Sequence, residues 1–328
     1  MFAGLITAPR RIELVDTPLV TLPDSSDGGG NQILFRPQLG CLCGSDLPFF
    51  EQTGEYTVEL GHSLHEIIGT VVATNGCRFQ EGDTVLAVPE DQRGMFEQFV
   101  VDEDRAIPLD SRVTIEQALM AQPLGTVICA LKKLPGVLDQ DVAVVGQGPI
   151  GQLFNASLRN LGARQVIGID LLPERIKRSA SLGATSTVCS RDTDPIEAVA
   201  ELTDGHMVDT VIEVVGHRDQ ALNLCIDLCR EKGKILYFGV PPERIDGIRW
   251  RDLMLKNLTV HTSINPDFDR DFPLAMRWIG EGRVQLESLI THRYPLAEIQ
   301  QAFETFSQRV EGALKVLVDF PQNGNRRS

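Results

Sequence analysis

The chain has 328 residues, of which 42% are hydrophobic and 23% charged, an ordinary balance for a globular protein. That length suggests about two domains, with ample chain to bury a core. A formal net charge of −14 without a long basic run argues against nucleic acid and anionic membranes as partners. No apolar stretch reaches membrane-spanning length, no signal-peptide pattern opens the chain, and the seven scattered cysteines fit reduced thiols. We therefore expect a cytoplasmic protein.

The first part of the chain, up to about residue 110, has the pattern of β-structure. Short runs of Val, Ile and Leu, such as "TVVAT", "DTVLAV" and "FEQFVV", are separated by Gly, Pro and Asp. These runs predict a compact, mostly β first domain.

From residue 141 the pattern changes to apolar strands that alternate with helical stretches. Six strands are predicted: "DVAVVG", "QVIGID", "TSTVCS", "VDTVIEVVG", "KILYFGV" and "LTVHTSI". The stretch "RDQALNLCIDLCREKG", residues 218–233, is predicted to be a helix between the fourth and fifth strands. This alternation predicts a parallel sheet with helices on both faces. The end of the chain reads as helical and closes with a strand, "GALKVLVDF".

A glycine motif, "VVGQGPIG", follows the first of these strands and opens a helix. Gly146 permits the tight turn, Gly148 lets the backbone approach a pyrophosphate, and Gly151 lets helix and strand pack closely. The helix N-terminus then offers free N–H groups to the phosphates. Asp170 ends the next strand, where it can bind ribose hydroxyls and would repel a 2′-phosphate. NAD is therefore predicted in preference to NADP, although Arg175 is near enough to contact either ribose or phosphate.

The strand–helix context and Asp170 disfavour the alternative that the glycines serve packing alone. The remaining residues expected at the cofactor site lie in the glycine motif or near the ends of later predicted strands: Pro149, Ile150, Val215, Gly239, Val240 and Ser263.

Candidate metal ligands lie upstream, in "CLCGSDLP" (41–48) and "LGHSLHEIIGTV" (60–71). Zinc takes thiolate sulfur, imidazole nitrogen and carboxylate oxygen, and a catalytic site leaves one position open. A lone histidine is usually packing or surface, so His62 and His65 have to be told apart by what could share a metal with them.

The order "CGSD", "HEIIGTVV", "EGDTVLAV", "GMFEQFVV" and then the glycine motif resembles the medium-chain zinc-dependent alcohol dehydrogenase superfamily, most of all its polyol and threonine dehydrogenase branch. The resemblance continues through "LITHRYPLAEIQQAFE" to "GALKVLVDF". It implies an α/β protein with a mostly-β GroES-like catalytic domain, residues 1–124 and 266–328, and a six-stranded parallel Rossmann domain, residues 125–265. It also implies that Lys315 reaches the cofactor pyrophosphate; the alternative is a solvated lysine.

The resemblance also implies a catalytic zinc held by Cys43, His65 and Glu66, because these residues match the family's Cys-Gly-Ser-Asp and His-Glu-x-x-Gly-x-Val motifs. Asp46 is then expected to orient the imidazole of His65, and Ser45 to pass the substrate proton towards the nicotinamide ribose. His62 becomes a neighbour near the pocket or at the surface, and Cys41 a small buried residue.

Three departures from the family pattern bear on the metal. Gln122 replaces an acidic residue, so it could coordinate zinc weakly, hold the zinc water by a hydrogen bond, or mark a site that has lost its metal. Only "EDQR" stands where the structural zinc lobe is expected, which predicts one catalytic zinc and no structural zinc. Pro48 stands where a histidine often completes the proton relay.

Two further sets of residues remain open. Phe49, Phe50 and Tyr56 could line a substrate pocket or fill the core. Cys225 and Cys229 could share a metal, but they follow an apolar helical stripe, which favours core packing.

The main functional hypothesis is an NAD-dependent, zinc-assisted dehydrogenase that interconverts a secondary alcohol (a polyol, cyclitol, sugar or amino alcohol) and its ketone. The alternatives are a zinc-free NAD(P)H-dependent reductase of an activated C=C bond and a non-catalytic dinucleotide-binding protein. The expected partner is a small alcohol or ketone. The strand "LTVHTSI" resembles the edge through which family members pair, so a homodimer or homotetramer is expected.

Overall fold

A computed structural model describes residues 1–23, 30–52, 58–216 and 220–322, and its chain divides into two compact units. The first unit comprises Met1–Gln122, Phe268–Gly280 and Ile290–Ser328, and the second comprises Pro123–Asp267 and Glu281–Leu289. The second unit therefore includes Glu281–Leu289, which the sequence placed in the catalytic domain. Arg283 from this stretch donates to Asn160 at 3.2 Å, and the side chain of Leu286 is buried.

The first unit is built mainly from antiparallel strands. In the described part of the chain, one sheet has the order β14-β15-β3-β4-β5-β7, with β6 also paired to β3, while β1 and β2 form a separate hairpin. Its strands are β1 (Phe2–Ala8), β2 (Arg11–Asp16), β3 (Gln32–Cys41), β4 (Glu66–Thr74), β5 (Thr84–Ala87), β6 (Phe99–Asp102), β7 (Ala106–Pro108), β14 (Ile290–Pro295) and β15 (Lys315–Asp319). Its helices are α1 (Leu47–Glu51), α2 (Ile115–Leu119), α9 (Asp271–Gly280) and α10 (Ile299–Gln308), and α3 (Ala121–Leu131) begins in it.

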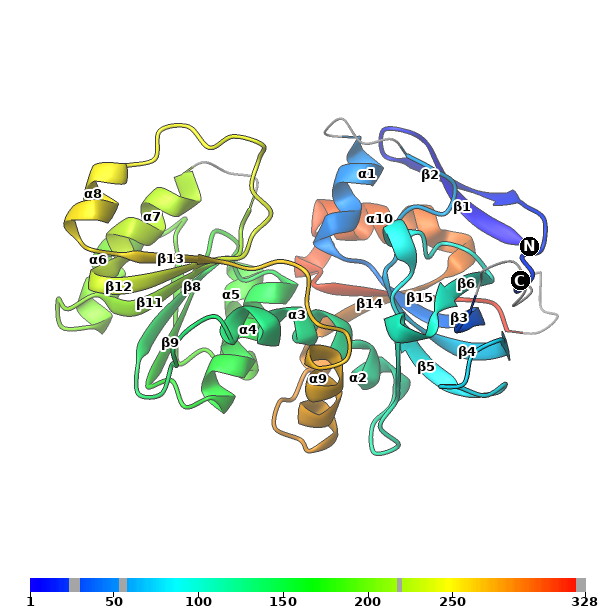
Figure 1. The fold of residues 1–328 in the computed structure, drawn as a ribbon. Coiled ribbons are helices and arrows are strands. Elements are labelled where there is room, and N and C mark those ends of the chain that lie inside the picture. The colour runs from blue at the N-terminus through cyan, green and yellow to red at the C-terminus, as the bar shows by residue number, and fades with distance from the viewer. Residues whose placement is uncertain (24–29, 53–57, 217–219, 323–328) are drawn as a thin grey trace. The chain divides into compact units, whose positions relative to one another are not determined.

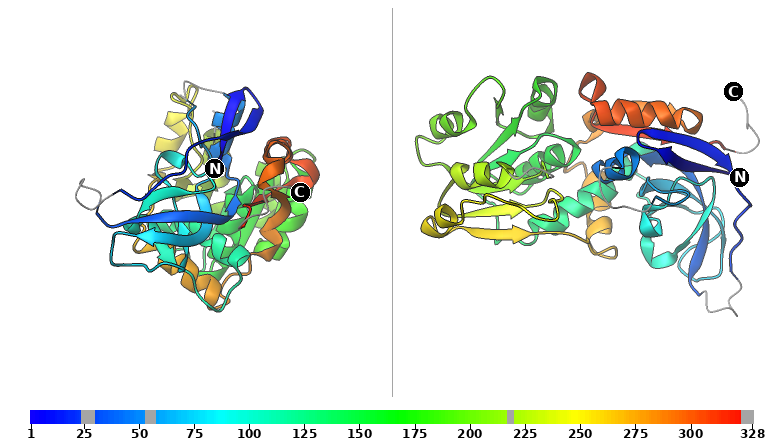
Figure 2. Two further views of the ribbon diagram at one scale, coloured as in Figure 1. Left: turned by 90° about the vertical axis from the view of Figure 1, so that its right-hand side faces the viewer. Right: turned by 90° about the horizontal axis from the view of Figure 1, so that it is seen from above.

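The core of the first unit joins segments that are far apart in sequence. Helix α10 packs against β14, β15 and the β1–β2 hairpin (Figure 2), and its Phe303 stacks on Phe50 of α1 with ring centroids 4.8 Å apart. Strand β15 is antiparallel to β3, which brings the C-terminal end of the chain into the sheet. The β texture predicted for the first part of the chain is confirmed, whereas β14 was not anticipated.

The second unit holds a parallel sheet of six strands in its described residues, in the order β10-β9-β8-β11-β12-β13. The strands are β8 (Asp141–Val145), β9 (Gln165–Asp170), β10 (Ser186–Cys189), β11 (Val208–Glu213), β12 (Cys229–Tyr237) and β13 (Thr259–Thr262). The helices are α4 (Pro149–Asn160), α5 (Pro173–Ser179), α6 (Pro195–Leu202), α7 (Gln220–Leu228) and α8 (Trp250–Leu255). The predicted six-stranded Rossmann sheet is confirmed, with its strand order reversing between β8 and β11.

Helices cover both faces of this sheet (Figure 1). Helices α6, α7 and α8 contribute apolar side chains to one core cluster, whereas α4 and α5 contact β8, β9 and β10 from the other face. The helix predicted over 218–233 is shorter than expected. It ends at Leu228, and Cys229 already belongs to β12, paired with Val208 of β11. Residues 218 and 219 lie outside the described part of the chain.

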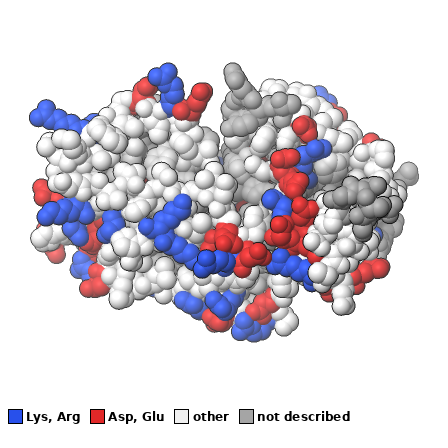
Figure 3. Space-filling view, viewed as in Figure 1, with Lys and Arg blue, Asp and Glu red and all other residues white. Residues whose placement is uncertain are grey.

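The surface carries acidic and basic side chains in small mixed groups on the face shown in Figure 3. Within the described residues, no helix is long and apolar enough to cross a membrane.

Candidate active site

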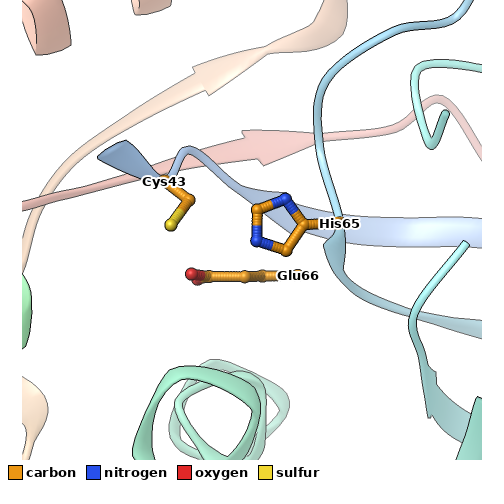
Figure 4. Close-up of side chains that lie close together, drawn as sticks. All are labelled: Cys43, His65 and Glu66. Carbon is orange, nitrogen blue, oxygen red and sulfur yellow. The ribbon is translucent and has the colours of Figure 1, made fainter. Parts of the chain in front are cut away.

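Three predicted zinc ligands meet in the first unit. One ligand atom each from Cys43, His65 and Glu66 lies within 4.8 Å of the other two (Figure 4). Sulfur, nitrogen and oxygen at this spacing fit the donor set that zinc takes in catalytic sites. These residues could therefore hold a zinc ion with one coordination position left for a water or substrate.

The local fold places these ligands close together. Strand β3 ends at Cys41 and β4 begins at Glu66, and these two residues are paired across the antiparallel ladder. Gly69 lies farther along β4, where an added Cβ would be 2.1 Å from the carbonyl oxygen of Arg36. The glycine of the His-Glu-x-x-Gly motif is therefore required because β3 and β4 approach too closely for a side chain.

Asp46 is fully buried and fixes the backbone around two of the ligands. Its carboxylate accepts hydrogen bonds from the N–H of Cys43 at 2.7 Å and from the N–H of Leu64 at 3.1 Å. The Nδ1 atom of His65 is 3.7 Å from Oδ1 of Asp46, which is longer than a hydrogen bond. Asp46 thus holds the ligand-bearing backbone firmly and contacts the imidazole only electrostatically.

The pocket around His65 favours positive charge. Burial lowers the pKa of His65, but the nearby Asp46 carboxylate and Cys43 thiol outweigh burial and raise that pKa well above its usual value. A site that stabilises an imidazolium also stabilises a metal cation, although a metal needs the neutral imidazole as its ligand. The neighbours of His65 therefore favour positive charge at its imidazole.

Lys315 forms an ion pair with Glu66 that the sequence did not reveal. Its Nζ lies 2.5 and 2.6 Å from the two carboxylate oxygens, and both side chains are buried. Burial lowers the pKa of Lys315, but the carboxylate of Glu66 more than offsets this, so the pKa lies above its ordinary value. Lys315 is therefore not a solvated lysine, and its contact with a cofactor pyrophosphate stays a prediction.

His62 is separate from the ligand group. Its Nδ1 accepts a hydrogen bond from the N–H of Glu59 at 2.6 Å, and its ring stacks on Phe49 with centroids 4.8 Å apart. Burial lowers the pKa of His62, so the ring is held neutral. Phe50 fills the core against α10, and Tyr56 lies outside the described residues.

Three other residues of this unit were discussed as site residues: Ser45, Gln122 and Cys41. Ser45 is half-buried in a short 3-10 helix, Gly44–Asp46, two residues after Cys43. Gln122 is buried in the first turn of α3. Its place in a zinc shell stays a prediction. Cys41 is buried, as expected, and burial raises the pKa of its thiol.

The chain beside the ligands is strained. Ser63 and Leu64 have φ of 85° and 61°, in the left-handed region that non-glycine residues rarely adopt. Both are fully buried, and Ser63 is held by the carbonyl of Gln92, whose loop replaces the expected structural zinc lobe. Strained residues of this kind are common at functional sites.

The glycine motif of the second unit fits a dinucleotide. Gly146 has φ of 101°, and an added Cβ on Gly151 would be 1.9 Å from the carbonyl oxygen of Gly146. Gly148 caps α4, and an added Cβ there would meet only the Arg175 side chain, at 3.4 Å. The first and third glycines are thus required by the fold, whereas Gly148 leaves room for a ligand to approach the loop. Pro149 and Ile150 form the first turn of α4.

Asp170 ends β9 at the same edge of the sheet. Its carboxylate accepts hydrogen bonds from the N–H of Gln147 at 2.7 Å and of Leu172 at 2.8 Å. These bonds hold it in place while its half-exposed oxygens can still accept ribose hydroxyls. The guanidinium of Arg175 lies over Gly148, 3.4 Å from where a Cβ on that glycine would stand.

The loops after β11 and β12 pack together at this edge. An added Cβ on Gly239 would be 2.3 Å from the N atom of Gly216. Glu213, which the sequence did not single out, accepts hydrogen bonds from the N–H groups of Val215 and Gly216 at 2.8 and 2.9 Å. Val215 and Val240 are exposed beside this contact, and their contact with a cofactor stays a prediction. Ser263, half-buried just after β13, points its hydroxyl towards the sulfur of Cys129.

Comparison with known proteins finds relatives that are dehydrogenases. A family described as zinc-binding dehydrogenase matches residues 149–281. Sorbitol dehydrogenase from Bacillus subtilis (strain 168) is 24% identical over 97% of this chain and 97% of its own length. L-idonate 5-dehydrogenase (NAD(P)(+)) from Escherichia coli (strain K12) is 23% identical over 89% of this chain and 93% of its own length. The alcohol dehydrogenase TADH from Thermus sp. ATN1 has the same fold, with a TM-score of 0.86, 24% identity and coverage of 98% of this chain and 100% of that chain.

The family model over residues 149–281, the dehydrogenase relatives and the shared fold together support the medium-chain zinc-dependent alcohol dehydrogenase superfamily, and within it the polyol dehydrogenase branch.

Proposed function

We propose that this chain is an NAD-dependent oxidoreductase that interconverts a secondary alcohol and its ketone with the help of one zinc ion. The observation that carries the proposal is the convergence of Cys43, His65 and Glu66. The proposed substrate is a polyol, cyclitol, sugar or amino alcohol, in keeping with the sorbitol and idonate dehydrogenases that the chain resembles.

In this proposal Cys43, His65 and Glu66 hold the zinc, which when bound acts as a Lewis acid and lowers the pKa of a hydroxyl group. Asp46 keeps the backbone N–H of Cys43 and Leu64 in place, so the ligands need no rearrangement. The hydroxyl of Ser45 accepts the proton of the substrate alcohol as it passes its own proton on. Pro48 carries no side-chain proton and Lys315 already binds both oxygens of Glu66, so in this proposal the path beyond Ser45 runs through water.

The second unit would bind the dinucleotide at the carboxyl edge of its sheet. The N-terminus of α4 faces the pyrophosphate, and Asp170 binds the adenosine ribose and repels a 2′-phosphate. The nicotinamide supplies the hydride chemistry when it is bound. NAD is therefore the proposed cofactor in preference to NADP.

The test is a panel of polyols, cyclitols, sugars and amino alcohols, with NADH formation followed by absorbance in the wild type and a Cys43→Ser variant. The proposal expects at least one alcohol to be oxidised and Cys43→Ser to abolish that activity. Tight NADH binding without turnover on any alcohol or ketone would instead support a non-catalytic dinucleotide-binding protein.

A second candidate is a zinc-free reductase of activated C=C bonds. The observation in its favour is that Lys315 already binds both oxygens of Glu66, and Gln122 offers a neutral amide where an acid is expected. This candidate predicts NAD(P)H-dependent reduction of an enone by metal-free protein, with no effect of Cys43→Ser.

We also propose that the chain forms a homodimer or homotetramer through the free edge of β13. Within the described residues β13 pairs only with β12, and large apolar side chains are exposed on β13 or near it in sequence: Trp250, Met254, Leu255, Val260 and Ile264. A free strand edge with exposed apolar side chains near it is a ready site for pairing with a second copy.

A further inference from the structure

The middle residue of the glycine turn, Gln147, does not face the space where a dinucleotide would lie. It stands between Gly146 and Gly148, yet its side chain is fully buried. Its Nε2 donates to the carbonyl oxygen of Val144, the penultimate residue of β8, at 2.9 Å. Gly168 of β9 makes room for it, since an added Cβ there would be 2.8 Å from Oε1 of Gln147.

The side-chain amide of Gln147 also forms hydrogen bonds with residues of two helices. Its Oε1 accepts hydrogen bonds from Nδ2 of Asn155 on α4 at 2.6 Å and from Oγ of Ser179, the last residue of α5, at 2.8 Å. All three side chains are fully buried. Gln147 thus ties the glycine turn to the strand before it and to both helices that flank it.

A second amide extends these contacts to the residue that lies over the turn. Gln152 of α4 is also fully buried, and its Nε2 lies 3.2 Å from the carbonyl oxygen of Gln147 and 3.1 Å from that of Arg175. It also donates to Oγ of Ser179 at 3.1 Å. The backbone of Arg175 is therefore fixed by the same network, while its guanidinium lies over Gly148.

The backbone of Gln147 completes the arrangement, because its N–H donates to Oδ2 of Asp170 at 2.7 Å. Any shift of the turn therefore moves the donor that holds the Asp170 carboxylate. The glycine turn, Arg175 and Asp170 are the three groups that would meet the pyrophosphate and adenosine ribose.

A buried polar network is a weak source of stability, because well-packed apolar side chains of similar volume often do as well. Its clearest use is to specify one arrangement of the groups it joins. We propose that Gln147 is a positioning residue that fixes the geometry of the adenosine half of the dinucleotide site, and with it the preference for NADH over NADPH. This inference rests on the proposed function.

The test measures the Kd of NADH and of NADPH, by quenching of protein fluorescence, for wild type and Gln147→Leu. Because the binding readout needs no substrate, it is independent of alcohol turnover. The Kd of NADH is expected to rise about tenfold, the effect of losing roughly one well-placed hydrogen bond. The Kd of NADPH should rise less, since the variant also loosens the Asp170 carboxylate that repels the 2′-phosphate. The ratio of the Kd of NADPH to the Kd of NADH therefore falls.

Two further variants keep the test decisive. Ser179→Ala removes one contact of the network and serves if Gln147→Leu does not fold; a smaller shift in the same direction is expected. Thr210→Val is the matched control, because Thr210 is equally buried in the same unit and its hydroxyl donates to Gln140 at 2.9 Å, away from the glycine turn. It should change stability without changing either Kd.

The inference is overturned if a folded Gln147→Leu protein binds NADH as tightly as the wild type. An equal rise of both constants would also overturn it, because it would show general loosening without an effect at Asp170. Failure of the wild type to bind either dinucleotide would instead reject the proposed function itself.

Discussion

The ammonium group of Lys315 and the carboxylate of Glu66 form a buried ion pair, although the two residues are 249 positions apart in the sequence. Strand β15, which begins with Lys315, delivers the cation to the start of β4 through its pairing with β3. Glu66 thereby serves two partners, because it neutralises Lys315 and also lies within reach of the thiol of Cys43 and the imidazole of His65.

Loss of the cation should destabilise the metal-free protein. In Lys315→Met the Glu66 carboxylate is left buried without a counter-charge, which costs about 3–5 kcal/mol in comparable cases. Zinc should restore part of this loss, because it supplies positive charge to the same carboxylate. Urea unfolding with and without zinc measures both effects. The double variant Lys315→Met/Glu66→Gln should recover much of the metal-free stability, and a double variant no more stable than the single one would contradict the account.

Two neighbouring residues with positive φ should respond oppositely to glycine. Leu64→Gly relieves backbone strain of roughly 1–2 kcal/mol but removes a fully buried side chain, a loss of about 2–5 kcal/mol, so it should destabilise. Ser63→Gly removes a small side chain whose buried hydroxyl has no hydrogen-bond partner among the described residues, so it should be neutral or stabilising. Chemical unfolding of both variants tests the pair. Equal destabilisation by both would show that strain plays no part.

The buried His62 should make stability depend on pH. Burial lowers its pKa in the folded state, so below the unfolded value of about 6.5 the unfolded chain binds more protons. His62 therefore lowers the free energy of unfolding as the pH falls through that value. His62→Gln keeps an acceptor for the N–H of Glu59 and removes the titration. Free energies of unfolding at pH 7.5 and at pH 5.5 should differ less in the variant, and an unchanged difference would argue against a neutral buried ring.

The proposed assembly can be tested at the edge of the second unit's sheet. Ile264→Lys places a charge on a residue that is 78% exposed just after β13, and it should shift the protein towards monomer in light scattering after gel filtration. Leu138→Lys is the matched control, since Leu138 is 76% exposed but lies just before β8, an inner strand of the sheet. If both variants keep the wild-type mass, the interface lies elsewhere.

Local periodicity was enough to predict the second unit's sheet. Most of its strands are short apolar runs that alternate with helical stretches, and this order predicts the parallel sheet. The prediction failed where pairing overrides a local pattern. Cys229 continues the apolar stripe that contains Cys225, yet it starts β12 because it pairs with Val208 of the neighbouring strand. Nothing in the sequence pattern shows that the helix ends before Cys229.

Part of the active site could be predicted because its ligands lie in short motifs. Cys43, His65 and Glu66 were assigned from spacing and resemblance, and the structure brings them together. The contact between Lys315 and Glu66 could not be predicted, since only the tertiary fold brings the two together. The inward direction of Gln147 was likewise invisible, because a turn residue has no periodicity to show which way its side chain points.

If Cys43, His65 and Glu66 hold a catalytic zinc, the purified protein should contain it, so the first quantity to measure is the zinc content per chain. Elemental mass spectrometry on protein purified without chelators should find about one zinc per chain, the occupancy of a single catalytic site. Cys43→Ser should lose it, and Cys41→Ser, at a buried thiol outside the ligand group, should keep it. Wild-type protein that binds NADH but holds no zinc would contradict the account and leave the C=C reductase as the reading to test next.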